Sequence, residues 1–184
     1  ELCYNDPLNN GALTPSQKGY HIVVERCCRN ASVVNLNVPG SQGIAIHCYI
    51  PPDMVPNNSP NINIDSIWVG CVNDTSQLSY HVSDLDGDSV VVSITPPLKG
   101  ANSGTGNPMP QPSNVLTWPI PTGIYSGGYS SSLPFGNGSV VDLISNQQVL
   151  NLYSAIQGDF SIGLKLFEYR NNNLIGIYNR EIQM

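Results

Sequence analysis

The sequence predicts an all-β protein that folds as a sandwich of stacked antiparallel sheets. About nine short runs of β-branched and other apolar residues recur along the 184-residue chain, and helical periodicity is nearly absent. Turn-forming residues separate these runs, because Gly (17) and Pro (15) are abundant and Asn and Ser are frequent. Many short strands joined by turns at this spacing are typical of sandwich architecture.

The expected strands follow one another at short intervals. In chain order they cover residues 20–25, 32–38, 43–50, 62–69, 77–82, 89–94, 139–144, 160–169 and 174–182. The turn pairs between them are Pro39-Gly40, Pro51-Pro52, Asp86-Gly87, Gly127-Gly128 and Asn171-Asn172. Because Asn tolerates the positive φ that hairpin turns require, we expect the last two runs to form a β-hairpin.

The prolines predict a division of the chain into two parts. Residues 51–60 hold four prolines and have the composition of a linker. We therefore expect a small N-terminal β subdomain over residues 1–56 and a larger β-sandwich over residues 57–184. The first part holds about three strands, too few to bury two faces alone, so it is expected to be incomplete and stapled by disulfides. Residues 99–112 predict a long surface loop.

The charge of the chain excludes some classes of function. The formal net charge is -6 and only seven residues are Lys or Arg, too few for the basic surface that nucleic acids require. No run of about 18 apolar residues occurs, so no membrane span is expected. Charged residues make up 11% of the chain, and the chain opens at Glu1 like a processed segment. This composition favours an exported protein.

The cysteines favour disulfide bonds. All five lie in the first 71 residues, and they are Cys3, Cys27, Cys28, Cys48 and Cys71. No pair has the C-x-x-C spacing of a zinc or redox site. Adjacent cysteines on a strand point to opposite faces, so Cys27 and Cys28 are expected to join two different bridges. The odd number leaves one thiol free or paired outside this chain.

A run of alternating carboxylates gives the clearest ligand pattern. It lies within residues 83–89 and consists of Asp84, Asp86 and Asp88. Ca²⁺ prefers six to eight hard oxygen ligands at flexible angles, so a calcium site is one interpretation. The alternative is a β-turn whose Asp side chains cap backbone N–H groups. Asp74 and Glu168 are candidates to complete a metal site.

Patterns for catalysis are weak, so a non-catalytic protein is expected. His21, His47 and His81 lie in expected strands beside apolar residues and are interpreted as core or surface residues. The motifs G-x-S-x-G and H-E-x-x-H are absent. The acidic residues show no spacing that favours a pair for glycoside hydrolysis, although a hydrolase with an unrecognised site remains the enzymatic alternative.

Several aromatic residues are candidates for a ligand surface. Tyr125 and Tyr129 flank a Ser-Gly-Gly segment and are candidates for an exposed surface that stacks on sugar rings. Ordinary packing is the alternative for both. Trp68 is expected in the core, and Trp118 either in the core or, because prolines follow it, exposed.

Several motifs, taken together in their order, match a known domain. They are Gly19-Tyr20-His21, Arg26-Cys27-Cys28-Arg29-Asn30, Asn58-Ser59-Pro60, Cys71-Val72-Asn73, Asp84-Leu85-Asp86-Gly87-Asp88, Pro97-Leu98-Lys99-Gly100-Ala101 and Glu168-Tyr169-Arg170 followed by Arg180. This order resembles a PKD/cadherin-like domain of large secreted Bacteroidota surface proteins with gliding-motility-associated sorting signals. The resemblance spans nearly the whole chain. Where this chain has Thr95-Pro96-Pro97, members of that family often have Cys-Thr-Pro, and Cys48 is an additional cysteine.

The resemblance implies an immunoglobulin/cadherin-like sandwich that is exported by type IX secretion to the cell surface or beyond. It also implies a role in adhesion or filament architecture, with other domains or copies of the same protein as partners, for instance by strand addition. Ser66 and Ser89 follow Asp and precede an apolar residue, which resembles the O-glycosylation acceptor of Bacteroidota glycoproteins. The first expected function is a structural or adhesive module stiffened by Ca²⁺. The alternative is a carbohydrate-binding module that uses Tyr125, Tyr129 and the loop at 99–112.

Overall fold

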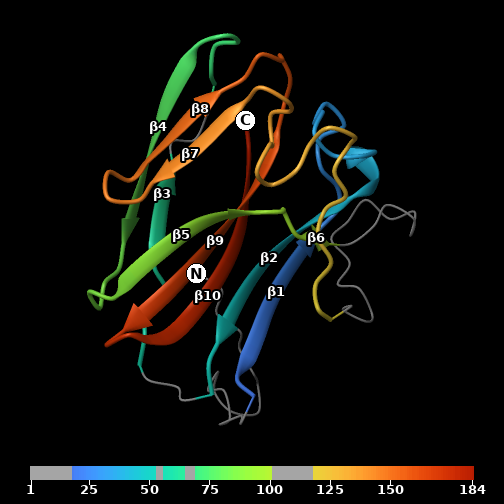
Figure 1. Ribbon diagram of the computed structural model, residues 1–184. Helices are drawn as coiled ribbons and strands as arrows, with labels where there is room; N and C mark the ends of the chain where they lie inside the picture. The colour runs from blue at the N-terminus through green and yellow to red at the C-terminus, as the bar shows by residue number, and fades with distance from the viewer. Residues whose placement is uncertain (1–17, 53–55, 65–68, 101–117) are drawn as a thin grey trace.

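The computed structural model describes residues 18–52, 56–64, 69–100 and 118–184 (Figure 1). In these ranges the regular structure consists of β-strands and one 3-10 turn, η1 (Pro39–Ser41). The strands are β1 (Tyr20–Arg26), β2 (Gly43–Ile50), β3 (Asn61–Ile64), β4 (Thr75–Ser83), β5 (Ser89–Thr95), β6 (Lys99–Gly100), β7 (Val140–Ile144), β8 (Val149–Tyr153), β9 (Ser161–Arg170) and β10 (Asn173–Gln183).

The strands form two antiparallel sheets, which confirms the predicted all-β class. The larger sheet has the order β1-β2-β10-β9-β5, and β6 pairs with β2 beside this path. The smaller sheet has the order β3-β4-β8-β7. In Figure 1 the smaller sheet lies beside β5, β9 and β10, whereas β1 and β2 lie away from it. The described chain is therefore consistent with a β-sandwich in which the larger sheet extends past the smaller one.

The main core lies between these two sheets. Ile162, Leu164 and Leu166 alternate along β9 and are 0%, 3% and 1% exposed. They belong to one apolar cluster with Leu150 and Leu152 of β8, which are 1% and 5% exposed. Since successive residues of a strand point to opposite faces, this alternation directs one face of β9 into the core. Full burial of each such side chain contributes about 1.5–3 kcal/mol.

Most predicted strands agree with the observed ones, but residues 32–38 form none, and β6 and β8 lie where no strand is predicted. Residues 65–68 of the predicted strand 62–69 and residues 101–112 of the predicted loop 99–112 lie outside the described residues. Residues 32–38 form only isolated bridges at Val33 and Leu36, both 2% exposed, so the strand predicted there is wrong. These residues are buried because a loop packs on the sheet, and Asn35 at 0% exposure binds the backbone of Ser161 through its amide. No strand is predicted over β8, although Leu150 and Leu152 alternate there with less buried residues.

One sheet contains strands from both parts into which the sequence is expected to divide. β2 pairs with β1 on one side and with β10, near the end of the sequence, on the other. The larger sheet therefore crosses the boundary predicted at residue 56, and residues 20–50 share their backbone hydrogen bonds with the C-terminal part. β10 supplies the neighbouring strand on one side of β2.

The hairpin predicted at the end of the sequence is present. β9 and β10 pair along their whole length, and the turn between them contains Asn171 (φ 50) and Asn172 (φ 64). Two consecutive residues with positive φ match the right-handed twist of the strands that they join. Asn adopts this conformation more readily than most residues, because its side chain can bond locally to the backbone.

A buried arginine ties the segment after β1 to β10. Arg29 is 3% exposed and donates Nε and Nη2 to the carboxylate of Glu181, at 2.8 and 2.6 Å. It also donates to the carbonyl oxygens of Gly43 and Leu98, at 2.6 and 2.7 Å. Ser161 donates its hydroxyl to Glu181 at 2.7 Å. Because both charges are buried and hydrogen-bonded, this arginine of the Arg-Cys-Cys-Arg-Asn motif has a structural role.

The cysteines are arranged differently from the prediction. Cys27 and Cys28 are bonded to each other, so the expectation that they join two different bridges is wrong. β1 ends at Arg26, and the alternation of side chains along a strand therefore does not apply to them. Cys48 is half-buried and Cys71 exposed, and neither is bonded to a described cysteine. Cys3 lies outside the described residues.

Among the described residues, no helix has the length and hydrophobicity that a membrane span requires.

Candidate metal centre

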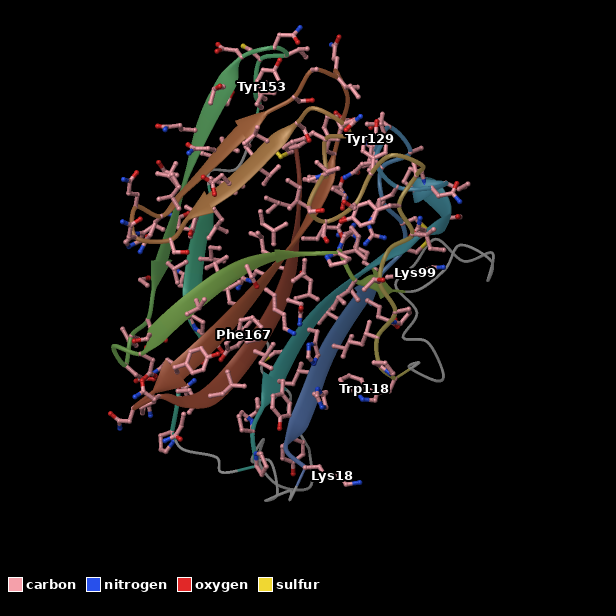
Figure 2. All side chains as sticks on the ribbon, in the orientation of Figure 1. Lys18, Lys99, Trp118, Tyr129, Tyr153 and Phe167 are labelled. Carbon is pink, nitrogen blue, oxygen red and sulfur yellow. A yellow bond between two sulfur atoms is a disulfide. The ribbon has the colours of Figure 1, made fainter. Side chains whose placement is uncertain are left out.

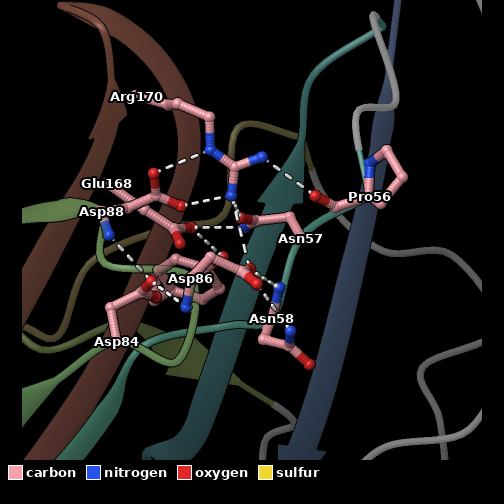
Figure 3. A network of polar contacts seen from close by, with 9 residues as sticks. Pro56, Asn57, Asn58, Asp84, Asp86, Asp88, Glu168 and Arg170 are labelled. Carbon is pink, nitrogen blue, oxygen red and sulfur yellow. Dashed lines mark hydrogen bonds and ion pairs between the residues drawn. The ribbon is translucent and has the colours of Figure 1, made fainter.

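The candidate site lies at the turn between β4 and β5, where it meets β9 and the segment before β3 (Figure 3). Asp84 Oδ1 accepts the backbone N–H groups of Asp86 and Asp88, at 2.9 and 3.0 Å. Gly87, with φ 78, adopts the left-handed conformation at this turn. One oxygen of Asp84 thus caps the turn, as the alternative interpretation of this sequence predicted.

The carboxylates of Asp86 and Asp88 have other partners. Arg170 donates Nε and Nη2 to Asp88, at 2.8 and 2.5 Å, and lies 3.4 Å from Asp86. Asp86 accepts the backbone N–H and the side-chain amide of Asn58, at 2.6 and 2.9 Å. The hydrogen bonds from Asn58 make the largest contribution to lowering the pKa of Asp86, and Arg170 lowers it further. Both aspartates are therefore held by groups of the protein itself.

Arg170 connects the strand β9 with the segment before β3. Its Nη1 donates to the carbonyl oxygen of Pro56 at 3.0 Å, and its Nη2 donates to Asn57 Oδ1 at 2.8 Å. Its bonds to Asp88 raise its pKa further, so it stays charged. One guanidinium thus holds together three segments that are far apart in the sequence, as the dashed lines in Figure 3 show.

Glu168 lies behind this network and is fully buried, with 0% exposure. Its Oε2 accepts the hydroxyl of Tyr178 at 2.6 Å and the side-chain amide of Asn57 at 2.9 Å. Gly176 leaves room for this arrangement, because a Cβ there would lie 2.4 Å from Glu168 Oε2 and 2.6 Å from the Tyr178 hydroxyl. The polar end of Glu168 is therefore fixed against the turn.

Two carboxylate oxygens at this place accept no hydrogen bond from an N–H or O–H group of the described residues, although the carboxyl groups that carry them lie close enough to share a proton. They are Asp84 Oδ2 and Glu168 Oε1, and both are buried. Burial raises the pKa of Glu168, and the neighbouring carboxyl group of Asp84 raises it by a smaller amount. Buried polar atoms in native proteins almost always have a partner, and two adjacent carboxylates repel each other when both are ionised. This pair consequently calls for a positive group between its oxygens.

The excess of negative charge at the site also favours a positive group there. One oxygen from each of Asp84, Asp86 and Asp88 lies within 4.8 Å of the others. With Glu168, four carboxylates converge near the single guanidinium of Arg170. A shared proton or a bound cation would both reduce this excess of negative charge. Carboxylate oxygens are hard ligands, so this donor set could hold a divalent metal ion.

The structure brings together four of the five residues considered from the sequence. Glu168 lies beside the aspartate turn, whereas Asp74 lies at the other end of β4 and takes no part in the site. Sequence reasoning missed Asn57 and Asn58, which contact Glu168 and Asp86. It also missed the bond from Arg170 to the turn. The pairings of these residues span 28 to 111 positions of the chain, and no local pattern signals them.

The two tyrosines proposed as a ligand surface, Tyr125 and Tyr129, are both partly buried. Tyr129 packs against the main core, 6.5 Å from Phe160 between ring centroids, and Figure 2 shows it away from Trp118. Tyr125 is half-buried, and burial raises its pKa to about 12. Ser89 is exposed at the start of β5, so its modification stays a prediction. Ser66, like Trp68, lies outside the described residues.

An unpredicted aromatic cluster lies on β1 and β2. His21 Nδ1 and His47 Nε2 are 2.9 Å apart and form a hydrogen bond, and the planes of the two rings are 20° from parallel. Burial lowers the pKa of His47 to about 4. Trp118 is 55% exposed and lies 4.1 Å from His21 between ring centroids, and Tyr49 stacks on His21 at a centroid distance of 4.7 Å. These rings form an uncharged, partly exposed surface.

Comparisons with protein-family models, with curated proteins and with solved structures found no match.

Proposed function

We propose that this chain is a non-catalytic structural or adhesive module of an extracellular bacterial surface protein or filament, with Ca²⁺ bound at the aspartate turn. The observation that carries the proposal is a pair of buried oxygens, Asp84 Oδ2 and Glu168 Oε1, that accept no hydrogen bond from a donor group of the described residues. They lie where β9, the turn between β4 and β5 and the segment before β3 meet. A cation there would strengthen the connection between both sheets of the sandwich.

The contacts of the site favour a mechanical role over a chemical one. Asp86, Asp88 and Arg170 bind one another or Asn58, so their polar atoms hold segments together. The buried pair Arg29 and Glu181 does the same at the other side of the larger sheet. Export by type IX secretion, a cell-surface location and an immunoglobulin/cadherin-like strand arrangement are part of the proposal and rest on the resemblance of the motifs.

Calorimetric unfolding with and without Ca²⁺ tests the proposal. After treatment with EDTA, added CaCl2 is expected to raise the melting temperature, because a ligand that binds only the folded state stabilises it. At a free concentration of about 100 times Kd this stabilisation is about 2.7 kcal/mol. Asp84→Asn is expected to abolish the response, and Asp142→Asn, which changes an exposed carboxylate of β7, should retain it.

A third variant separates the metal from the ion pairs. Asp88→Asn breaks the bidentate bond to Arg170, so it should lower the melting temperature in EDTA as well as in CaCl2. A melting temperature of the native sequence that does not respond to Ca²⁺, with no heat of binding in a titration, would show the site to be proton-bridged and the calcium proposal to be wrong.

A carbohydrate-binding role is the second candidate, and one observation favours it. Trp118, His21 and Tyr49 form a partly exposed aromatic cluster beside the neutral His47. Exposed rings stack on the apolar faces of sugars, and uncharged hydrogen-bonding groups suit their hydroxyls. This surface is better suited to the role than Tyr129, which packs against the core.

Titration with neutral oligosaccharides, followed by tryptophan fluorescence and calorimetry, tests this second candidate. Saturable binding that Trp118→Ala abolishes and Tyr129→Phe leaves unchanged would support it, because the second variant keeps its ring in the core. A Trp118→Ala variant that binds as tightly as the native sequence would refute it.

A further inference from the structure

A cavity of about 310 Å³ lies at the end of the sandwich opposite the aspartate turn. It is lined by residues 69–72 and 74 before β4, by residues 154 and 156–159 after β8, and by core residues beneath them. Tyr153, the last residue of β8, marks this end of the molecule in Figure 2. Nine residues of β4 separate the cavity from the aspartate turn, about 30 Å at the rise of a strand.

The floor of the cavity is apolar and firmly packed. Phe135, Leu152 and Phe160 line it and are 3%, 5% and 4% exposed. The rings of Phe135 and Phe160 meet edge to face, with centroids 4.8 Å apart. Because these residues belong to the main core, they hold the floor in a fixed shape, and an apolar group of a ligand would lie on a preformed surface.

The rim of the cavity combines apolar and acidic side chains. Val69 is 78% exposed and Ile156 is 40% exposed. Asp74 and Asp159 are also exposed, and neither forms an ion pair with a described residue. Asp74 accepts the N–H of Thr75 at 2.8 Å, a bond that leaves its charge uncompensated. The entrance is therefore negative in a chain whose formal net charge is -6.

The size and the charge of the cavity define the group that fits it. A volume of about 310 Å³ is at the lower end of ligand pockets, so it holds one long side chain rather than a polymer. Lysine and arginine bury their aliphatic stems on apolar surfaces while their charged heads stay at a polar rim. An opposite charge at the rim also favours association with a basic partner and discriminates against an acidic one.

We propose that this cavity receives a lysine or arginine side chain of a partner protein. The aliphatic stem lies on Phe135, Leu152 and Phe160, and the cationic head lies between Asp74 and Asp159. The contact gives the module a docking end that is independent of the aspartate turn. It does not rest on calcium, and it holds whether the module acts in a filament or as an adhesin.

Methyl-resolved NMR titrations of the full chain test the proposal with short peptides. The probes are acetyl-Gly-Arg-Gly-amide and its Lys counterpart, with citrulline and norleucine in place of the basic residue as uncharged controls. Saturable shifts are expected for the methyl groups of Val69, Leu152 and Ile156 with both basic peptides. The uncharged peptides should bind at least about fivefold more weakly, and salt should weaken binding of the basic ones.

A double variant and a control variant test whether the rim carboxylates Asp74 and Asp159 bind the cationic head of the peptide. Asp74→Asn/Asp159→Asn retains the acceptor oxygens that bind the Thr75 N–H and the Ser32 hydroxyl, so the fold is expected to persist. It should weaken binding of the Arg peptide by at least about fivefold, whereas Asp142→Asn should leave it unchanged. The single variants Asp74→Asn and Asp159→Asn replace the double variant if its circular dichroism or melting temperature departs from that of the native sequence.

The outcomes separate this proposal from its rivals. If the norleucine peptide binds as tightly as the basic peptides, the proposal is wrong and the cavity binds an apolar side chain without regard to charge. If no peptide gives a saturable shift, the proposal is wrong as well. The titrations are carried out in EDTA and again in CaCl2. If the calorimetric experiment shows no calcium binding, the peptide titrations in EDTA still test the cavity.

Discussion

At the scale of single residues, position in the fold decides what each carboxylate can do. Asp88 is bound by Arg170 through two nitrogens, and its charge is compensated. Glu168, fully buried on the neighbouring strand, has one oxygen with two donors and one with none. The like charge of Asp84 beside that second oxygen makes ionised Glu168 costly, and a cation or a proton would remove this cost.

Glu168→Gln tests this difference directly. Glutamine retains an oxygen for Tyr178 and Asn57 and can donate its amide to Asp84, so like-charge repulsion disappears. In EDTA at neutral pH the variant is expected to unfold at a higher urea concentration than the native sequence. Its free energy of unfolding should be about 1 kcal/mol larger. Its response to CaCl2 should be weaker than that of the native sequence. A variant that is less stable in EDTA and responds fully to Ca²⁺ would contradict this account.

His47 gives the pH dependence a predictable sign. Burial, with the neighbouring His21 and Lys165 adding to it, lowers its pKa from 6.5 to about 4 in the folded chain. Unfolded chains therefore bind the proton more readily, and the contribution of His47 to stability is full above pH 6.5 and falls as pH drops toward 4. The loss is at most about 3 kcal/mol.

Urea unfolding across this pH interval measures the effect. His47→Gln is expected to flatten the acid side of the stability profile, whereas His81→Gln, at an exposed position of β4, should keep the native slope. Parallel profiles for the native sequence and His47→Gln would show that another group controls the acid transition.

At the scale of elements, close backbone contacts determine which strands can pair. β9 lies between β5 and β10, and at Gly163 its backbone lies close to the end of β5. A Cβ at Gly163 would lie 2.5 Å from the carbonyl oxygen of Thr95 and 2.7 Å from backbone atoms of Pro96. These contacts are with backbone rather than flexible side chains, so the strands would have to separate.

Gly163→Ala is accordingly expected to destabilise the chain by about 1–3 kcal/mol or more, as overpacking does in a close-packed interior. Gly127→Ala is the matched control, because a Cβ there meets nothing within 4 Å. Thermal unfolding of the two variants measures the difference. Equal melting temperatures would mean that the β5–β9 pair has more room than its backbone separation indicates.

At the scale of the whole molecule, the bond between Arg29 and Glu181 joins residues 152 positions apart. It holds the Arg-Cys-Cys-Arg-Asn motif against β10, in the same sheet that β1 and β2 complete. Their side chains are 0% and 3% exposed, so loss of one partner leaves a buried charge without compensation. The two parts of the sequence are thus coupled through the larger sheet.

Arg29→Met is expected to reduce the free energy of unfolding by about 3–5 kcal/mol, the usual cost of breaking a buried ion pair. Arg29→Met/Glu181→Gln should recover part of this loss, and Arg180→Met, at an exposed position of β10, should change stability by at most about 0.5 kcal/mol. Urea denaturation followed by near-ultraviolet circular dichroism measures all three. A small effect of Arg29→Met would indicate that the N-terminal strands are coupled to β10 through backbone bonds alone.

The features that could be predicted from the sequence are those with a local cause. Alternating apolar residues predicted most of the strands, and Asn171-Asn172 predicted the last hairpin, because both depend on neighbours in the chain. The same reasoning failed over residues 32–38, where burial of Val33 and Leu36 comes from a loop that packs on a sheet. It failed again at Cys27-Cys28, which lie beyond the end of β1.

The sequence by itself determined the all-β class, the aspartate turn and the scarcity of positive charge, since composition and short-range spacing encode each of them. Only the tertiary structure decided that β2 pairs with β10, that Glu168 is buried beside Asp84, and that Arg170 rather than Asp74 completes the turn. These contacts join segments far apart in the chain. Their partners are selected by the packing of both sheets together, and no window of neighbouring residues contains that information.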